Sequence, residues 1–312
     1  MKKFLAIILT VLLTVLTFAG CDAGEAIPSD DGRLTVVTTV FPVYDWTRSI
    51  TGDLCNVIYL DKNGTDMHSF EPTANDILAL AGADVFIHIG GTSDEWVEAA
   101  LASADNDTLR VLTLTEVTGV LEEETVEGMQ THHEEEAEAD EHIWLSLRKA
   151  QTAVNAICNA LSEADGANAV TYRSNADGYI KQLADLDKDF ENCVAGAKRR
   201  VLLFADRFPF RYLTEDYGIE YYAAFPGCSA ETEASFSTLA SLIDKTKTLS
   251  LPCIIVIENS SAGIAEAISD KTGAKILTMH SCQSVTAKHI ENGLTYLSVM
   301  KDNLQVISEA LN

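Results

Sequence analysis

The feature that most constrains the fold is an alternation of short apolar strands with amphipathic helices, which occurs in both halves of the chain. Strand candidates rich in β-branched residues are separated by helix candidates, and glycine or proline closes most of these segments. This alternation is typical of parallel sheets with right-handed crossovers. The predicted strands cover residues 34–40, 55–60, 84–89 and 110–114 in the first half and 201–204, 220–224, 253–257 and 275–278 in the second.

A long segment without proline separates the two halves. Its apolar residues, among them Leu183, Leu186 and Phe190, lie near helical spacing, so we expect one long rigid helix. The predicted fold is therefore α/β, with two β/α lobes of mainly parallel sheets joined by this helix and a cleft between the lobes. The predicted organisation is an N-terminal lobe over residues 34–168, a connector helix over 169–198 and a C-terminal lobe over 199–312.

The start of the chain has the pattern of a targeting segment. Two lysines precede an apolar stretch over residues 4–18, and an Ala-Gly pair then stands directly before Cys21. We interpret residues 1–20 as a lipoprotein signal peptide and residues 21–33 as a tether. Lipid on Cys21 would then anchor the protein to the outer face of the cell membrane. An ordinary secretory signal followed by a chance cysteine is the alternative.

Export allows disulfides to form. Six of the seven cysteines follow Cys21, and none of their spacings is CxxC, so a four-cysteine zinc site is not expected. Cys228 and Cys282 both lie in loop segments that contain glycine or serine, and they are the predicted disulfide pair. The others have apolar neighbours, which indicates buried thiols.

A strongly acidic segment interrupts the first half. From Glu122 to Glu141 there are ten acidic residues and no Lys or Arg, which favours a solvated loop over residues 121–141. His132 and His133 within this loop are candidates for an accessory metal-binding loop, and an acidic surface loop with incidental histidines is the alternative. The net charge of −25 argues against nucleic acid as a partner and suits attraction of cations.

Three other histidines follow predicted strands or the acidic segment. His68, His142 and His280 are expected at the side of the lobes that faces the cleft. Three imidazoles with a carboxylate or water suit Zn²⁺, whereas Mn²⁺ prefers more oxygen ligands. Zinc is thus the favoured ion and manganese the alternative. His88 and His289 are expected to have structural roles.

Two motifs around these histidines resemble those of a known family. The stretches DMHSFEPT (residues 66–73) and DEHIWL (residues 140–145) resemble the ligand motifs of the zinc- and manganese-binding lipoproteins of bacterial ABC importers. An acidic, histidine-bearing loop before the second motif resembles the zinc-type branch. The resemblance covers essentially the whole mature chain. It implies a metal in the cleft between the lobes, capture of zinc outside the cytoplasm and delivery to an ABC permease in the membrane.

The resemblance also implies a ligand set. His68 and His142 would be ligands from the N-terminal lobe. The family's third ligand corresponds to Ala205, which cannot bind metal, so Asp206 beside it is the candidate substitute. His280 stands where the family usually has an aspartate as the fourth ligand. The carboxylates expected near the cleft, as partners of the imidazole N–H groups or as residues of the lobe interface, are Glu258 and Glu233.

Two other classes of function remain open from the sequence. The chain has no HExxH, GxSxG or GxxxxGK motif, so we expect no enzyme, and a zinc-dependent hydrolase or lyase is the secondary candidate. A metal-independent surface adhesin is the third. We expect the protein to be a monomer.

Overall fold

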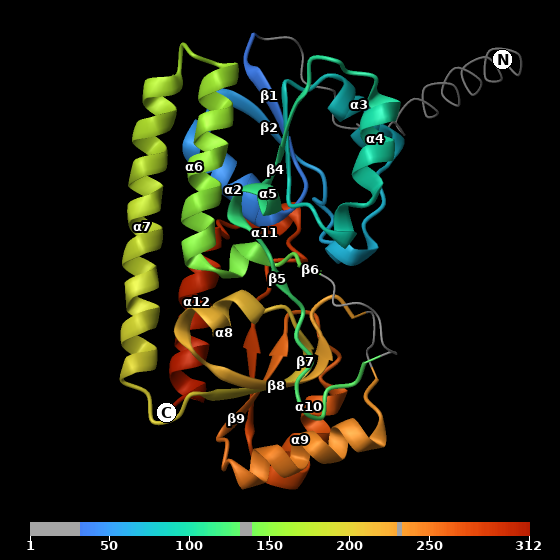
Figure 1. Ribbon diagram of the computed structural model, residues 1–312, viewed down its shortest axis with the longest axis vertical. Coiled ribbons are helices and arrows are strands. Elements are labelled where there is room, and N and C mark those ends of the chain that lie inside the picture. Colours follow the sequence, from blue (N-terminus) through green and yellow to red (C-terminus); the bar gives the residue numbers. More distant parts are fainter. Residues whose placement is uncertain (1–31, 132–138, 230–232) are drawn as a thin grey trace, which may run out of the picture. The chain divides into compact units, whose positions relative to one another are not determined.

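The described part of the structure begins after the predicted targeting segment. The computed structural model describes residues 32–131, 139–229 and 233–312 (Figure 1). The predicted signal peptide and Cys21 lie outside these ranges, as do His132 and His133 of the acidic segment. None of the helices in the described ranges has the length and apolar character needed to cross a membrane.

Four parallel strands form the sheet of the N-terminal lobe, in the order β2-β1-β3-β4. β3 is buried along its whole length, as expected for a parallel sheet with helices on both faces. The four predicted strands are confirmed, and each ends one or two residues earlier than predicted. They are β1 (Leu34–Thr38), β2 (Cys55–Tyr59), β3 (Val85–His88) and β4 (Arg110–Thr113), and the helices between and after them are α2 (Phe41–Thr51), α3 (Ala74–Ala81), α4 (Trp96–Ala104) and α5 (Leu114–Thr118).

The C-terminal lobe repeats the same arrangement in the order β10-β9-β7-β8, again with parallel pairing. In both sheets the first strand lies between the second and the third, so the direction of the crossovers changes beside it. Ligands of such sheets bind at this point, beyond the carboxyl ends of the strands. The elements are β7 (Val201–Phe208), β8 (Glu220–Pro226), β9 (Cys253–Ile257), β10 (Lys275–Met279), α8 (Arg211–Tyr217), α9 (Phe236–Thr248), α10 (Gly263–Thr272), α11 (Ala287–Glu291) and α12 (Tyr296–Ala310).

One strand of the C-terminal lobe extends further than the sequence predicts. We expected β7 to end at Phe204, but it continues to Phe208 with an irregular register between Phe204 and Arg207. Asp206 therefore lies within the strand and not in a loop after it. An irregularity of this kind turns the side chains next to it away from the regular alternation.

The predicted connector is the 27-residue helix α7 (Ala169–Ala195), which pairs with α6 (Leu147–Ala164) (Figure 1). α7 contacts α2 and α6 on the N-terminal side and α8 and α12 on the C-terminal side. Its buried stripe includes Leu183, Leu186 and Phe190, the residues whose spacing predicted a helix. A second helix, α12, also links the halves, because it contacts α2 as well as β9 and β10.

The two lobes share one continuous apolar core. Trp144, which follows His142 closely, is fully buried and donates its Nε1–H to the carbonyl of Ser281 across a distance of 2.7 Å. Tyr296 at the start of α12 donates its hydroxyl to the carbonyl of Trp144. The segment that carries the second histidine motif is therefore held by residues of the C-terminal lobe.

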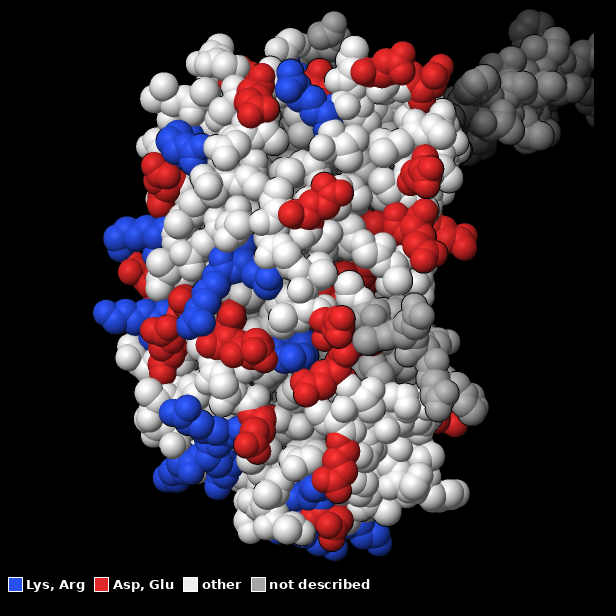
Figure 2. All heavy atoms as spheres, viewed as in Figure 1, with Lys and Arg blue, Asp and Glu red and all other residues white. Residues whose placement is uncertain are grey.

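The ends of the acidic segment are ordered, which corrects the expectation that the whole segment is solvated. β5 (Leu121–Glu122) and β6 (Ala139–Asp140) form an antiparallel pair, and Asp140 and Glu141 are each only 1% exposed. Both carboxylates accept hydrogen bonds, which offsets their removal from water. Over the visible face of the molecule acidic side chains are widely spread, whereas Lys and Arg gather mainly beside α6 and α7 and at the far end of the C-terminal lobe (Figure 2).

A carboxylate at the junction of three helices should make stability depend on pH. Asp45 of α2 accepts hydrogen bonds from the Tyr179 hydroxyl of α7 and the Tyr296 N–H of α12, each at 3.1 Å. Burial raises the pKa of Asp45 from 3.8 to about 6, and the two hydrogen bonds oppose this only in part. A raised pKa favours folding while the carboxyl is protonated, so this contribution is lost as the pH rises toward and through 6.

We predict that Asp45→Asn, which keeps an oxygen acceptor but cannot ionise, gains stability relative to the wild type as the pH rises. The difference in free energy of unfolding should grow by about 1 kcal/mol between pH 5 and pH 7.5, measured by urea denaturation. Asp53→Asn is the control, because the Asp53 side chain is 99% exposed, and it should show no such trend. A constant difference for Asp45→Asn at both pH values would contradict the prediction.

Candidate metal centre

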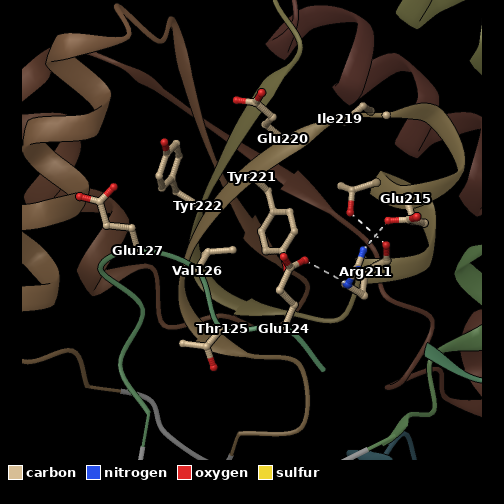
Figure 3. Close-up of a pocket in the computed structure, with 12 residues that line it drawn as sticks. Glu124, Thr125, Val126, Glu127, Arg211, Glu215, Ile219, Glu220, Tyr221 and Tyr222 are labelled. Carbon is tan, nitrogen blue, oxygen red and sulfur yellow. Dashed lines mark hydrogen bonds and ion pairs between the residues drawn. The ribbon is translucent and has the colours of Figure 1, made fainter. Parts of the chain in front are cut away.

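A pocket of 640 Å³ in the C-terminal lobe is formed where the acidic segment runs past α8 and β8 (Figure 3). Arg211 lines this pocket and pairs with Glu124 at 3.3 Å and with Glu215 at 2.9 Å. Since none of the described residues that line this pocket is a histidine or cysteine, they do not offer the donors that zinc prefers. Its lining residues are Glu124, Thr125, Val126, Glu127, Arg211, Thr214, Glu215, Gly218, Ile219, Glu220, Tyr221 and Tyr222.

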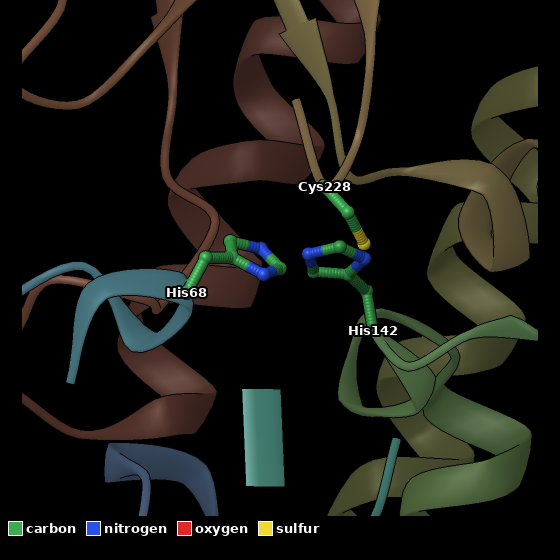
Figure 4. Close-up of side chains that lie close together, drawn as sticks. All are labelled: His68, His142 and Cys228. Atoms are coloured by element: carbon green, nitrogen blue, oxygen red, sulfur yellow. The ribbon is translucent and has the colours of Figure 1, made fainter. Parts of the chain in front are cut away.

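A different place brings together the two histidines of the sequence motifs. His68 lies in the short 3-10 turn η1 (Met67–Ser69) after β2, and His142 directly precedes η3 (Ile143–Leu145) after β6. Their ring centroids are 5.4 Å apart (Figure 4). His142 is fully buried, and the His68 side chain is 14% exposed. The prediction that these two imidazoles converge agrees with the structure.

Each imidazole is oriented by an adjacent carboxylate. Asp140 lies 2.8 Å from Nδ1 of His142 and also accepts the His142 backbone N–H. Glu141 lies 3.2 Å from Nδ1 of His68, and the Ser93 hydroxyl, which donates to Glu141, lies 2.7 Å from the same nitrogen. A carboxylate on Nδ1 fixes the proton there and leaves the Nε2 lone pair free to bind a metal.

Local geometry explains how these carboxylates reach the rings. The carboxylate of Asp66 accepts the His68 N–H and holds the turn that presents the ring. Gly91 has φ +110°, and a Cβ there would lie 2.3 Å from Oε2 and 2.9 Å from Cβ of Glu141. Only glycine combines this backbone conformation with the close approach of Glu141.

The charges around His142 raise the pKa of its imidazole. Burial alone would lower the pKa of His142, but the carboxylates of Asp140, Glu141 and Glu123 together outweigh burial and raise it above 6.5. Burial alone would raise the pKa of Glu141. Its hydrogen bonds to His68 and Ser93 and the charge of His142 outweigh burial and lower this pKa. The site is therefore electronegative and suited to a cation.

Gln283 occupies the point on which both rings converge. Its amide nitrogen lies 3.1 Å from Nε2 of His68 and 2.6 Å from Nε2 of His142. A single NH₂ group can donate one hydrogen to each ring, which requires a lone pair on both Nε2 atoms. A metal bonded to both rings would have to displace this amide. The sequence reasoning missed Gln283, although it closely follows the strand that was taken to carry the fourth ligand.

A cysteine completes this cluster. One ligand atom each from His68, His142 and Cys228 lie within 4.8 Å of one another (Figure 4). The predicted disulfide is not present, because Cys228 and Cys282 are both free thiols and Cys282 is fully buried elsewhere in the core. Burial, together with the charge of Glu123, raises the pKa of the Cys228 thiol. The loop position of Cys228 was the signal in the sequence that set it apart from the buried thiols.

His280 does not join the cluster, contrary to the prediction from the sequence. Its Nδ1 accepts the backbone N–H of Cys282 at 2.9 Å and lies 3.3 Å from Glu258, so the ring faces this carboxylate. Glu258 also accepts the N–H and the hydroxyl of Ser281. Glu258 therefore lies beside the imidazole of His280. Glu233 is exposed and lies before α9.

At the end of β7, where the sequence predicted a metal ligand, the structure has the positively charged side chain of Arg207. Ala205 is buried in the core of the C-terminal lobe. Asp206 lines a pocket of 370 Å³ together with Asp66 and Glu258, and one of its carboxylate oxygens is buried without a hydrogen-bond partner in the described residues. Arg207 beside it donates to Asp66 at 2.6 Å and so braces the turn that carries His68.

The chain is similar to known proteins that are named for zinc binding or zinc uptake. The zinc-binding lipoprotein AdcA of Streptococcus pneumoniae is 32% identical over 284 residues, which make up 89% of this chain and 56% of that protein. The high-affinity zinc uptake system protein ZnuA of Bacillus subtilis is 28% identical over 291 residues, or 91% of this chain and 89% of that protein. This chain thus spans little more than half the length of the AdcA proteins.

The fold is also that of solved structures. The structure of the Zn(II)-bound ZnuA-like domain of Streptococcus pneumoniae AdcA superposes with a TM-score of 0.73 at 30% identity, over 90% of this chain and 99% of that domain. These comparisons confirm the two-lobe fold and the resemblance inferred from the two histidine motifs. The family model for the periplasmic zinc-uptake complex component A, ZnuA, matches residues 36–310, and the chain belongs to this family.

Proposed function

We propose that this protein captures Zn²⁺ outside the cytoplasm and delivers it to an ABC importer in the membrane. The observation that carries this proposal is the convergence of the Nε2 atoms of His68 and His142 on one point, with a carboxylate behind each ring. The names of the related zinc-binding and zinc-uptake proteins support the same reading. The lipid on Cys21 would keep the protein at the membrane that holds its permease.

The chemistry of the site favours zinc over manganese. Neutral imidazole nitrogen is a good ligand for Zn²⁺, whereas Mn²⁺ needs a set richer in oxygen. The formal net charge of −25 raises the local concentration of divalent cations without selecting among them. Selection must therefore come from the groups that bind the ion directly, and the two buried rings are among them.

Binding and release require no chemical step. The ion is cargo: it replaces the Gln283 amide between the rings and leaves again when the protein meets its permease. The family is one of transport components, and we propose that the chain has no catalytic activity and acts as a monomer. A hydrolase would need a bound water and a general base, and the carboxylates nearest the rings are already engaged by Nδ1.

We predict that His142→Ala and His68→Ala each weaken zinc binding by more than about 100-fold. This loss is larger than the effect of removing a residue that only hydrogen-bonds a metal ligand. Isothermal calorimetry with a competing chelator measures the affinity. Zinc at 100 times the dissociation constant of the wild type should also stabilise the wild type by about 2.7 kcal/mol. The same zinc concentration should stabilise neither variant by this amount. A wild type that binds no zinc would refute the proposal and favour a metal-independent adhesin.

His280→Ala tests the ligand set that the sequence suggested. The structure directs this ring toward Glu258, so we expect the variant to lose less than about 10-fold in zinc affinity. Asp206→Ala should behave in the same way. A loss as large as that of His142→Ala would show that His280 moves into the site when zinc binds.

Zinc affinity should also depend on pH. Protons compete with zinc for the neutral imidazoles, and the pKa of His142 lies above 6.5, so affinity should begin to fall at a higher pH than for an unperturbed histidine. Asp140→Asn removes the first of the carboxylates that raise this pKa and should move the decline to lower pH. An unchanged pH profile in this variant would contradict the assignment.

A further inference from the structure

We propose that the Cys228 thiolate is the third protein ligand of the zinc ion, so that the C-terminal lobe supplies a sulfur donor opposite the two imidazoles. This inference rests on the proposed zinc capture and names the donor that the sequence motifs do not supply. Ala205 and Arg207 at the end of β7 offer no donor to a cation, and Asp206 between them lines a pocket that neither His68 nor His142 lines, whereas Cys228 lies close to both histidines.

The geometry already lies close to that of a bound ion. Zn–N bonds of about 2.0–2.1 Å and a Zn–S bond of about 2.3 Å place tetrahedral donors about 3.3–3.6 Å apart. The donors of His68, His142 and Cys228 lie within 4.8 Å of one another before any ion is present. A bound ion would draw these atoms together, from separations of at most 4.8 Å to about 3.3–3.6 Å.

The turn that carries Cys228 is built against His142. A Cβ on Gly227 would lie 2.9 Å from the carbonyl oxygen of Phe208 and 3.1 Å from Cε1 of His142, so the absence of a side chain lets the backbone approach the ring. The Cys228 N–H donates to Glu123 at 3.0 Å, which ties the turn to the acidic segment. Two independent contacts thus hold the thiol beside the rings.

A sulfur donor accounts for selection between ions. Two imidazoles and one thiolate form a soft set that favours Zn²⁺ and disfavours Mn²⁺. On binding, the S–H bond is replaced by a Zn–S bond and the proton passes to solvent. The thiolate lowers the charge of the ion and its direct ligands from +2 to +1, and the buried carboxylates of Asp140 and Glu141 behind the rings offset the rest, so the ion is less costly to bury.

The test uses Co²⁺ as a spectroscopic probe and Zn²⁺ competition in the full-length protein, kept reduced. The wild type should show a thiolate-to-cobalt charge-transfer band in the near ultraviolet. Cys228→Ser should lose this band, weaken zinc binding at least 10-fold and reduce the preference for Zn²⁺ over Mn²⁺. The matched control is Cys193→Ser, because Cys193 is a free and partly buried cysteine on α7, and it should keep both the band and the affinity. Gln283→Ala should also keep the band.

Two results would overturn the inference. Wild-type protein that binds cobalt without a thiolate band refutes it with no variant needed, and a band that persists in Cys228→Ser refutes it as well. Circular dichroism establishes that each variant is folded. If the wild type binds neither metal, the proposed zinc capture fails. If it binds zinc and Cys228→Ser binds it equally well, only the sulfur ligand fails.

Discussion

The site depends on one pair of adjacent carboxylates that hold two different rings. Asp140 contacts Nδ1 of His142, and Glu141 contacts Nδ1 of His68, which lies 73 positions earlier in the sequence (141 minus 68). Both carboxylates are buried, which costs free energy because they lose their contact with water. Hydrogen bonds from backbone amides and contacts with the rings offset this cost. This arrangement sets the tautomer and the direction of each imidazole before any ion arrives, and it lowers the reorganisation that binding requires.

The C-terminal lobe contributes to the same site in another way. Arg207 reaches across to Asp66, and the side chains of this pair are only 20% and 24% exposed, so the ion pair is partly shielded from water. Burial would raise the pKa of Asp66, but Arg207 outweighs it and lowers the pKa, which keeps Asp66 ionised as the acceptor for the His68 N–H. A cation at this place therefore stabilises the turn of a ligand, where the sequence reasoning expected a ligand itself.

The sequence predicted the parts of the structure that arise from local periodicity. The eight strands of the two sheets and α7 followed from β-branched runs and from the spacing of residues such as Leu183 and Phe190. His68 and His142 followed from motifs at strand ends. Cys228 and Gln283 did not, because their positions depend on a close approach at Gly227 and on how the chain turns after β10. Spacing along the chain does not encode such contacts.

The same limit explains the error at His280. The residue stands directly after β10, where a ligand was expected, but its Nδ1 accepts the N–H of Cys282 and this bond directs the ring toward Glu258. The chain then turns so that Gln283, three residues later, reaches the rings. His280 and Gln283 are thus only three residues apart in the sequence, but of these two it is Gln283 that contacts the rings. The strand pattern does not distinguish the two positions.

The division of the proposed donors between the lobes has a consequence for the proposed transport of zinc. Both imidazoles belong to the N-terminal half, whereas Cys228, the proposed third ligand, belongs to the C-terminal half. An ion held by donors from both sides binds best when the lobes are close, since metal–ligand bonds tolerate deviations of only about 0.2 Å. A permease that binds the form with separated lobes more tightly than the form with closed lobes would favour release of the ion. The ratio of its affinities for these two forms sets how far the equilibrium shifts. Release then needs only a small displacement of the lobes and no change in the rings themselves.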